Sequence, residues 1–349
     1  MAEPYCLAFL WSLKMLHANL LGRARRTLPC WSFDEKGGAM THIALRSLAK
    51  GLGSFVLPQL RNTHVEGGTA SARHCYDLFF RHYGHLAPWL NGKRPEVLVE
   101  VGPGSSLGVG IAALLAGVDT YIGLDLQDHR SIEHDLEVLN GLIELFGERA
   151  AFWDNTVSGD IFFPPSPTNF AWDQIDGIVQ QRLSAEAIDA LKADLVNGSE
   201  RLKFVAPWTD FNVLQAGVAD WLMTHSVMEH VDNLVDTYIA IARWLKPGGF
   251  ATHLIDFQSH GLSSDWNGHW VLSAPTWTMM RGRRPYLINR KWRSHHINLM
   301  QESGFEILAE LQYIRADGLA RKEFRAPFTS MPNGDEKAAM SFFVTRKIG

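Results

Sequence analysis

A glycine turn and an acidic residue roughly twenty positions later are the residues with the clearest chemical use. Gly102 and Gly104 follow the short β-branched run Val97–Val101, and Asp125 follows a second run, Thr120–Leu124. Glycines lack a Cβ, so the backbone can approach a ligand closely, and an acid at this spacing can reach the two hydroxyls of a ribose. The pattern therefore predicts a site for an adenosine-containing cofactor.

Glu100 and Leu107 distinguish between the two cofactors that use such a turn. A nicotinamide dinucleotide site has a third glycine three positions after the second, where this chain has Leu107. An ionised Glu100 would repel a pyrophosphate, whereas it would attract the α-ammonium of S-adenosylmethionine. The segment favours S-adenosylmethionine over NAD(P), and the residues expected to contact it here are Glu100, Gly102, Pro103, Gly104, Ser105, Asp125 and Leu126.

Side chains that could move a proton follow two later predicted strands, at residues 218–224 and 250–257. They are His225, Glu229, His230, Asp256 and His260. The reacting groups of a parallel sheet gather at the carboxyl ends of its strands. We expect His225 or His260 to act as a general base, with Asp256 as its orienting partner. Such a base is worth ~10²- to 10⁴-fold in rate.

Histidines and an acid near the second of these strands also resemble a metal-ligand set. His253 and Asp256 are an odd number of residues apart, so in a strand they point to opposite faces. We therefore predict no metal among His253, Asp256 and His260.

Alternating strands and helices must position these residues. The further predicted strands are residues 201–206, 305–313 and 340–345, and the predicted helices are residues 43–57, 72–90, 132–146, 185–196 and 234–245. Another helix runs to about Leu115, with Ser105 or Ser106 as its N-cap. Lys246-Pro-Gly-Gly249 ends the helix over residues 234–245, because proline and glycine do not continue a helix.

Three motifs in order resemble those of the class I S-adenosylmethionine-dependent methyltransferases. They are Glu100-Val-Gly-Pro-Gly104, Ser226-Val-Met-Glu-His230 and Leu245-Lys-Pro-Gly-Gly249. The resemblance implies an α/β fold with a Rossmann-like, seven-stranded, mostly parallel sheet whose last strand is antiparallel. It also implies S-adenosyl-L-methionine as cofactor and S-adenosyl-L-homocysteine as product.

The same resemblance suggests roles for residues outside the motifs. Asp210 is expected at the adenine edge with Trp208 as a stacking surface, and His225 is expected to face the methyl group. Helices before the first strand often cover the cofactor in this family, so lid candidates are Tyr76, Arg81 and Tyr83. The alternative for these three residues is packing against the sheet.

The acceptor is the least determined part of the reaction. Nucleic-acid amino-methyltransferases resemble one another in a proline-rich turn, which Thr224-His-Ser-Val227 lacks, so oxygen is favoured over nitrogen. Residues 259–293 form a predicted substrate cover whose aromatic and basic side chains suit sugar rings and anions. These side chains are Trp266, His269, Trp270, Trp277, Arg281, Arg283, Arg284, Tyr286, Arg290, Trp292 and Arg293. A solvated turn and buried tryptophans are the alternative.

The segments 75–82, 108–117 and 256–289 also look similar to bacterial methyltransferase-domain proteins associated with surface-glycan biosynthesis. We therefore expect O-methylation of a sugar, nucleotide sugar or glycan-type small molecule. An NAD(P)-dependent oxidoreductase and a non-catalytic, cofactor-binding protein of the same fold remain the alternatives.

Composition bounds the organisation of the chain. Its 349 residues, 46% of them hydrophobic, can bury one α/β core with additions. We expect a dispensable extension at 1–39, helices at 40–94 that cover the cofactor, and a catalytic domain at 95–349 with insertions at about 128–200 and 259–293. The 33 basic and 37 acidic residues disfavour nucleic-acid binding, and no membrane span is expected. Three scattered cysteines suggest a cytoplasmic protein.

Overall fold

The computed structural model describes residues 44–61, 69, 71–154, 156–157, 160–168, 170–208 and 210–349. The predicted extension at 1–39 and the first residue of the helix predicted over 43–57 lie outside the described residues. Within the described part of the chain, no helix is both long enough and apolar enough to cross a bilayer.

A seven-stranded sheet forms the centre, with strand order β5-β2-β1-β6-β7-β9-β8. All strands run parallel except β9, which is antiparallel to both β7 and β8. This confirms the Rossmann-like sheet with an antiparallel last strand. The strands are β1 Val97–Val101, β2 Thr120–Leu124, β5 Leu202–Val205, β6 Ala219–His225, β7 Leu245–Asp256, β8 Phe305–Ile314 and β9 Ala338–Lys347, and a separate hairpin joins β3 Thr156–Val157 to β4 Asp160–Ile161.

The sequence predicted that this strand begins at residue 250, but β7 begins five residues earlier, at Leu245. The Lys-Pro-Gly-Gly segment is therefore part of the strand. The pairing with β6 shifts register between Ala219 and Trp221 to accommodate this segment. Glycine is favoured at position 249, because a Cβ there would lie 2.9–3.3 Å from three backbone carbonyl oxygens. The same segment still ends the preceding helix, as predicted.

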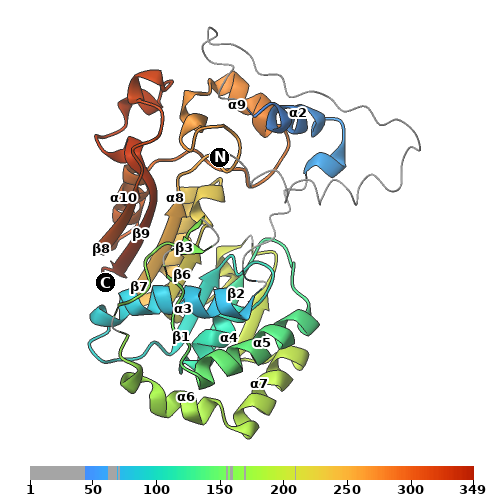
Figure 1. Ribbon diagram of the computed structural model, residues 1–349, viewed down its shortest axis with the longest axis vertical. Coiled ribbons are helices and arrows are strands. Elements are labelled where there is room, and N and C mark those ends of the chain that lie inside the picture. The colour runs from blue at the N-terminus through green and yellow to red at the C-terminus, as the bar shows by residue number, and fades with distance from the viewer. Residues whose placement is uncertain are drawn as a thin grey trace, which may run out of the picture. The chain divides into compact units, whose positions relative to one another are not determined.

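Helices cover both faces of the sheet (Figure 1). Strand residues alternate between the two faces, so Leu98 and Trp221 join one core cluster while Val99 and Leu222 join the other. The first face is covered by α3 Ala72–Leu86, α4 Gly108–Leu115, α5 Ile132–Gly147, α6 Asp176–Arg182 and α7 Ala185–Asn197, and the second by α8 Leu234–Trp244 and α10 Arg293–Glu302.

Helix α3 packs into the core and does not form an open lid. Tyr76 and Arg81 are fully buried and Tyr83 nearly so, which confirms the packing alternative for the three lid candidates. The Arg81 guanidinium donates to the carbonyls of Trp153, Phe162 and Pro164, so it fixes the segment after α5. The helix ends at Leu86 and continues as a 3-10 turn, Ala87–Trp89, because Pro88 cannot donate a helical hydrogen bond.

The predicted substrate cover contains helix α9 Ala274–Arg281, which packs on α2 Leu45–Gly53 (Figure 1). The two helices approach closely at Gly51, where a Cβ would lie 2.1 Å from the Met280 carbonyl oxygen. Arg283 N–H also donates to Ser54 Oγ at 2.8 Å. The N-terminal helix α2 is therefore attached to the cover and not to the sheet.

We predict that Gly110→Ala destabilises the protein although alanine is the better helix former. A Cβ on Gly110 would lie 2.4 Å from the Tyr121 ring, which is fully buried. Alanine gains about 1 kcal/mol of helix propensity, but overpacking costs about 1–3 kcal/mol, so the free energy of unfolding falls. Urea unfolding measures it. Gly177→Ala in α6, which meets nothing within 4 Å, is the control and should be neutral or stabilising. Equal stabilities of the two variants would contradict this packing.

Candidate functional site

The glycine turn after β1 is closed by the acid after β2. Gly102 and Gly104 have φ of +80° and +79°, a backbone conformation that glycine adopts without strain. A Cβ on Gly102 would lie 2.4 Å from Val227. The Asp125 carboxylate accepts hydrogen bonds from Gly104 N–H at 3.3 Å and from Leu126 N–H at 2.6 Å. The predicted turn and the predicted acid therefore lie together at the carboxyl ends of the two strands.

The start of α4 differs from the sequence prediction. Its N-cap is Leu107, not Ser105 or Ser106, and the Leu107 N–H donates to Asp135 of α5 at 2.7 Å. Ser106 Oγ accepts from Gly108 N–H at 3.1 Å and donates to the Thr69 carbonyl. Ser105 N–H donates to Thr69 Oγ1 at 3.0 Å. Thr69 and Asp135, from two neighbouring segments, thus hold this turn together with Ser106.

Glu100 lies at the end of β1 and is 2% exposed. Its carboxylate accepts a hydrogen bond from the Tyr121 hydroxyl at 2.6 Å. Burial raises the pKa of Glu100 to about 7; the Tyr121 hydrogen bond opposes the rise and the negative charge of Asp125 adds to it. Glu100 is thus a buried acid, close to Asp125, that a cationic ligand would stabilise in its ionised form.

Trp208 and Asp210 have local structural partners. The Trp208 ring is 7% exposed and packs edge-on against Trp244, with ring centroids 5.6 Å apart. Trp244 is therefore the packing partner of Trp208 in this structure, and its predicted stacking on adenine stays a prediction. Asp210 caps a 3-10 turn, Phe211–Val213, by accepting from Asn212 N–H at 2.8 Å, and it is exposed. Its predicted contact with adenine stays a prediction.

His225 ends β6 and is part of a buried chain of hydrogen bonds. Its Nδ1 lies 3.0 Å from His82 Nε2, and His82 Nδ1 lies 2.9 Å from Thr252 Oγ1. The Trp221 indole also donates to Thr252 Oγ1 at 2.9 Å. Burial, reinforced by His74 and Arg81, lowers the pKa of His225 to about 3, so the imidazole is neutral. The sequence predicted Asp256 as the orienting partner if His225 is the base. The structure instead places His82 next to His225.

The tautomers of this chain decide what His225 can do. The Trp221 indole can only donate, so Thr252 Oγ1 accepts from it. If His82 Nδ1–H also donates to Thr252, then His82 Nε2 accepts from His225 Nδ1–H, and His225 Nε2 keeps its lone pair. Within the described residues no partner meets that nitrogen. In this state His225 can accept a proton.

Asp256 and His260 form a second group, together with Glu229 and His230. His260 Nε2 lies 3.3 Å from Asp256 Oδ2, and the rings of His230 and His260 have centroids 5.1 Å apart. Burial alone would lower the pKa of His260, but the hydrogen bond and charge of Asp256, with the charge of Glu229, raise it. Burial, reinforced by Asp256, raises the pKa of Glu229 to about 8. The expected pairing of Asp256 with a histidine is present, at His260.

His253 lies apart from this group, as the strand periodicity predicted. Its Nδ1 lies 2.9 Å from Thr224 Oγ1, and its ring packs edge-on against Tyr238 of α8 on the other face. His253 Nε2 is buried without a hydrogen-bond partner in the described residues.

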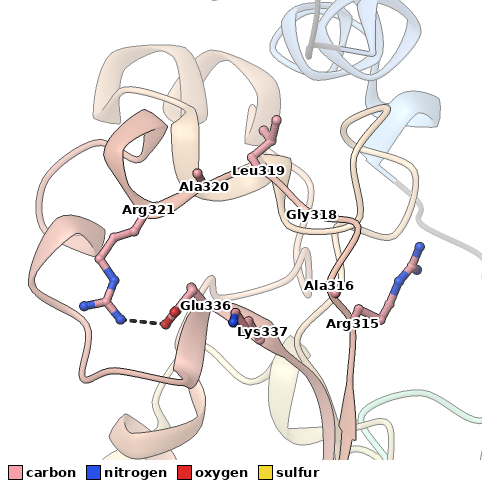
Figure 2. Close-up of a pocket in the computed structure, with 8 residues that line it drawn as sticks. All are labelled: Arg315, Ala316, Gly318, Leu319, Ala320, Arg321, Glu336 and Lys337. Atoms are coloured by element: carbon pink, nitrogen blue, oxygen red, sulfur yellow. Dashed lines mark hydrogen bonds and ion pairs between the residues drawn. The ribbon is translucent and has the colours of Figure 1, made fainter.

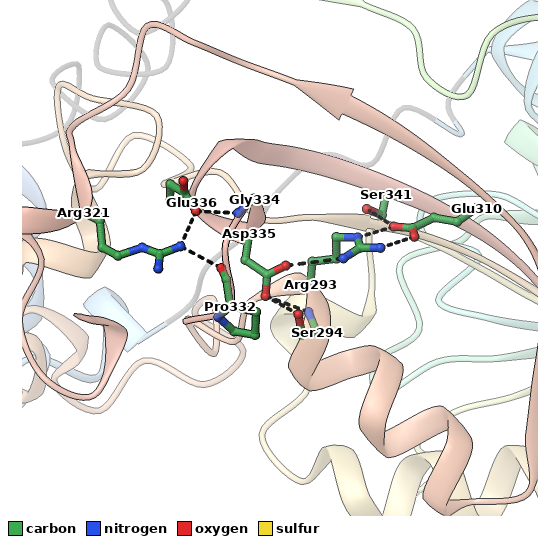
Figure 3. Close-up of polar contacts among 9 residues, drawn as sticks. All are labelled: Arg293, Ser294, Glu310, Arg321, Pro332, Gly334, Asp335, Glu336 and Ser341. Atoms are coloured by element: carbon green, nitrogen blue, oxygen red, sulfur yellow. Dashed lines mark hydrogen bonds and ion pairs between the residues drawn. The ribbon is translucent and has the colours of Figure 1, made fainter. Parts of the chain in front are cut away.

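The basic side chains of the cover contact groups of the protein itself, which corrects their interpretation as a surface for anions. Arg293 pairs with Glu310 and Asp335 (Figure 3). Arg281 donates to both oxygens of Asp232 at 2.6 Å. Their charges are therefore already neutralised. Likewise Arg284 and Arg290 are buried and donate to backbone carbonyls, Arg283 lies over Phe55, and Trp266, His269 and Trp270 are buried. Tyr286 remains partly exposed.

A pocket of about 250 Å³ lies beside the end of β8 (Figure 2). Its two arginines are paired, Arg321 with Glu336 at 2.6 Å and Arg315 with Asp317 and with Gln258 Oε1 at 2.9 Å. None of the predicted cofactor or catalytic residues lines it. The pocket is therefore separate from the groups described above.

The sequence did not indicate several of the residues that hold the site. His82, Thr252 and Tyr121 lie on elements that were predicted correctly, but their contacts depend on how α3 crosses the sheet and on the register of β2. Gly110 and Gly123 could have indicated that the Tyr121 side chain is buried between them, since both positions leave room for it.

No protein-family model matches the sequence, and no curated protein matches it. Phosphoethanolamine N-methyltransferase 2 of Haemonchus contortus, in complex with S-adenosyl-L-methionine, is 13% identical over 79% of this chain and 57% of its own, with a TM-score of 0.38. S-adenosylmethionine-dependent methyltransferases of Mesorhizobium loti and Methanosarcina mazei are 12% and 8% identical, each over 75% of this chain and 97% of theirs, with TM-scores of 0.35 and 0.38. Likeness at these values assigns no substrate and no site residue, so function must be argued from this chain's residues.

We predict that Glu100→Gln removes a pH dependence of stability. The pKa of Glu100 in the folded state, about 7, lies above its ordinary value of 4.5 in the unfolded chain, so the contribution of Glu100 to stability is full below pH 4.5 and is lost as pH rises through 7. Glutamine still accepts the Tyr121 hydrogen bond and carries no charge. The free energy of unfolding of the variant, relative to wild type, should rise by about 3 kcal/mol between pH 4.5 and 8.

Urea unfolding of both proteins across this pH range measures the difference. Glu96→Gln, at an exposed carboxylate four residues earlier, is the matched control. If the free energies of unfolding of Glu100→Gln and wild type differ by the same amount at every pH, the pKa of Glu100 is not raised in the folded protein.

Proposed function

We propose that the protein is an S-adenosylmethionine-dependent methyltransferase. The observation that supports this most is the closure of the Gly102–Gly104 turn by the Asp125 carboxylate at the carboxyl ends of β1 and β2. A carboxylate has about four acceptor positions, and the three backbone N–H groups near Asp125 leave capacity for a ribose hydroxyl. The glycine turn offers unobstructed backbone beside it.

Glu100 supports S-adenosylmethionine over a dinucleotide. Its carboxylate is buried 2.6 Å from one hydroxyl, so bringing a cation to it would recover part of the cost of burial. The α-ammonium of the cofactor supplies such a charge, whereas a pyrophosphate would add further negative charge. The position of the third dinucleotide glycine is Leu107, which is buried at the N-cap of α4.

The acceptor atom is proposed to be a hydroxyl oxygen, with His225 as the general base. The acceptor oxygen attacks the methyl carbon in line with the sulfonium, the C–O bond forms as the S–C bond breaks, and the electron pair of that bond stays on sulfur. The hydroxyl proton passes to His225 Nε2, and His82 holds the imidazole in the required tautomer. Asp256 ends β7, the strand next to β6, and His260 follows it; both are proposed to contact the acceptor.

A sugar, nucleotide sugar or glycan intermediate stays the predicted acceptor class, in a cytoplasmic protein. The support for this acceptor class is the similarity of the cover segment to glycan-associated methyltransferase-domain proteins. The arginines that suggested an anion no longer add support, since they contact groups of the protein itself. A non-catalytic protein of this fold would need neither a base nor an acceptor, and turnover distinguishes it.

We predict that the full-length protein binds S-adenosylmethionine and S-adenosylhomocysteine, and that Asp125→Asn weakens both at least about tenfold. The reason is the loss of a charge-assisted hydrogen bond to the ribose, worth ~1.5–3 kcal/mol. Isothermal titration calorimetry measures both affinities. Asp128→Asn, three residues later and exposed, is the matched control and should bind like wild type. Binding of NADH or NADPH with no response to S-adenosylhomocysteine would overturn the proposal in favour of an oxidoreductase.

We predict that His225→Asn lowers kcat by ~10²- to 10⁴-fold and leaves the affinity for S-adenosylmethionine within about twofold. Asparagine can still contact His82 but has no atom at the position of Nε2. Release of S-adenosylhomocysteine is measured with an acceptor found by screening hydroxylated small molecules. His295→Ala on α10 is the control. A wild-type kcat for His225→Asn would exclude His225 as the base.

A further inference from the structure

Three side chains from two separate loops bring metal-binding atoms together at the carboxyl edge of the sheet. Glu229 and His230 belong to the 3-10 turn Met228–His230 after β6, and His260 follows β7. One ligand atom from each lies within 4.8 Å of the other two. We propose that these three residues bind one divalent transition-metal ion. The proposal departs from the sequence prediction of no metal, which considered His253 with Asp256 and His260.

The spacing of the ligand atoms fits such an ion. Nitrogen and carboxylate ligands lie ~2.0–2.2 Å from zinc and from similar ions, so two ligands of one ion are at most ~4.4 Å apart. The observed limit of 4.8 Å exceeds this by a small amount that side-chain rotation can remove. One carboxylate and two imidazoles form a set that suits Zn²⁺, Co²⁺, Mn²⁺ or Fe²⁺ better than Mg²⁺ or Ca²⁺, which prefer oxygen.

Glu229 lacks the partner that a buried carboxylate needs. The residue is 3% exposed, and neither carboxylate oxygen meets a hydrogen-bond donor in good geometry within the described residues. An ionised carboxylate in such a place is costly unless it is paired or binds a metal. A cation between Glu229 and the two histidines supplies the missing partner.

The surroundings orient both histidines as metal ligands. His230 Nδ1 lies 2.9 Å from the Tyr286 carbonyl oxygen, which can only accept, so Nδ1 carries the proton and Nε2 has a free lone pair. Asn289 holds the turn by donating to the carbonyls of Met228, at 2.7 Å, and Val231, at 3.0 Å. Asp256 contacts His260 at 3.3 Å. Carbonyl and carboxylate partners of this kind fix the orientation of metal-bound imidazoles.

The backbone around the three ligands is also unusual. Ser226, His260 and Tyr286 have φ of +53°, +48° and +54°, in the left-handed region that non-glycine residues rarely adopt. They stand, respectively, just before the turn that carries Glu229, at a ligand, and at the carbonyl that orients His230. Such conformations persist where function fixes them.

If the proposed methyl transfer holds, the ion also favours acceptors that offer oxygen atoms to a metal. Three protein ligands leave coordination positions open for oxygen atoms of an acceptor. An acceptor with two adjacent oxygens, such as a vicinal diol, would bind through both. Metal binding lowers the pKa of the hydroxyl, which suits a base as weak as the neutral His225.

Metal binding to the full-length protein tests the proposal without any methyl transfer. Titration calorimetry with ZnCl₂, CoCl₂ and MnCl₂ should show one ion per chain for at least one of these metals, and weaker binding of MgCl₂. Glu229→Gln and His260→Asn should each weaken binding roughly tenfold or more. Asparagine is chosen because it tolerates the left-handed backbone. His295→Ala, outside the group, is the matched control and should bind like wild type.

S-adenosylhomocysteine is titrated into the same samples, so the two proposals can fail separately. Loss of metal binding in the two variants, with S-adenosylhomocysteine binding retained, would support the site and show that the variants are folded. Equal metal binding by wild type and both variants, or no binding of any of the three metals, would overturn it. Either result would leave the methyltransferase proposal intact if S-adenosylhomocysteine still binds.

Discussion

The hydrogen bonds of Asp125 hold the cofactor side of the site together. Its carboxylate accepts from the turn after β1, its N–H donates to the Val205 carbonyl at 3.0 Å, and its carbonyl accepts from Trp208 N–H at 3.0 Å. One residue therefore connects the carboxyl ends of β1, β2 and β5. The residue that we propose as the ribose ligand thus also sets the spacing of the loops around it. Loss of its charge affects the loops and the ligand together.

Helix α3 connects this half of the site with the half that could carry chemistry. Near its start, Cys75 lies against Ser106 and Gly108 of the glycine turn. Two turns later His82 reaches Thr252 and His225, and Arg81 holds the segment after α5. The helix lies before the first strand in sequence, yet it joins parts of four elements. Helix α3 is accordingly part of the framework of the site.

The sequence predicted the elements well and the side-chain partners poorly, for identifiable reasons. β1 and β2 have the predicted limits, because Pro95 and Gly102 bound the first run and Asp119 and Asp125 bound the second, which leaves little choice of strand ends. Arg281 and Arg290 were expected at an anion, but Arg281 pairs with Asp232 and Arg290 donates to the Leu272 carbonyl. A residue type shows what a side chain can bind. Which partner it meets depends on tertiary packing that local patterns do not contain.

Two buried carboxylates at neighbouring strand ends suggest how the apo protein is prepared for its ligands. Glu100 lies one residue before the end of β1 and has one hydrogen-bond donor, and Glu229 follows β6 and has none in good geometry within the described residues. Burying an acid with so few partners opposes folding. Both positions become favourable once a cation arrives. The ligands proposed above, an ammonium at Glu100 and a metal ion at Glu229, would both supply this charge, so binding of either would stabilise the fold.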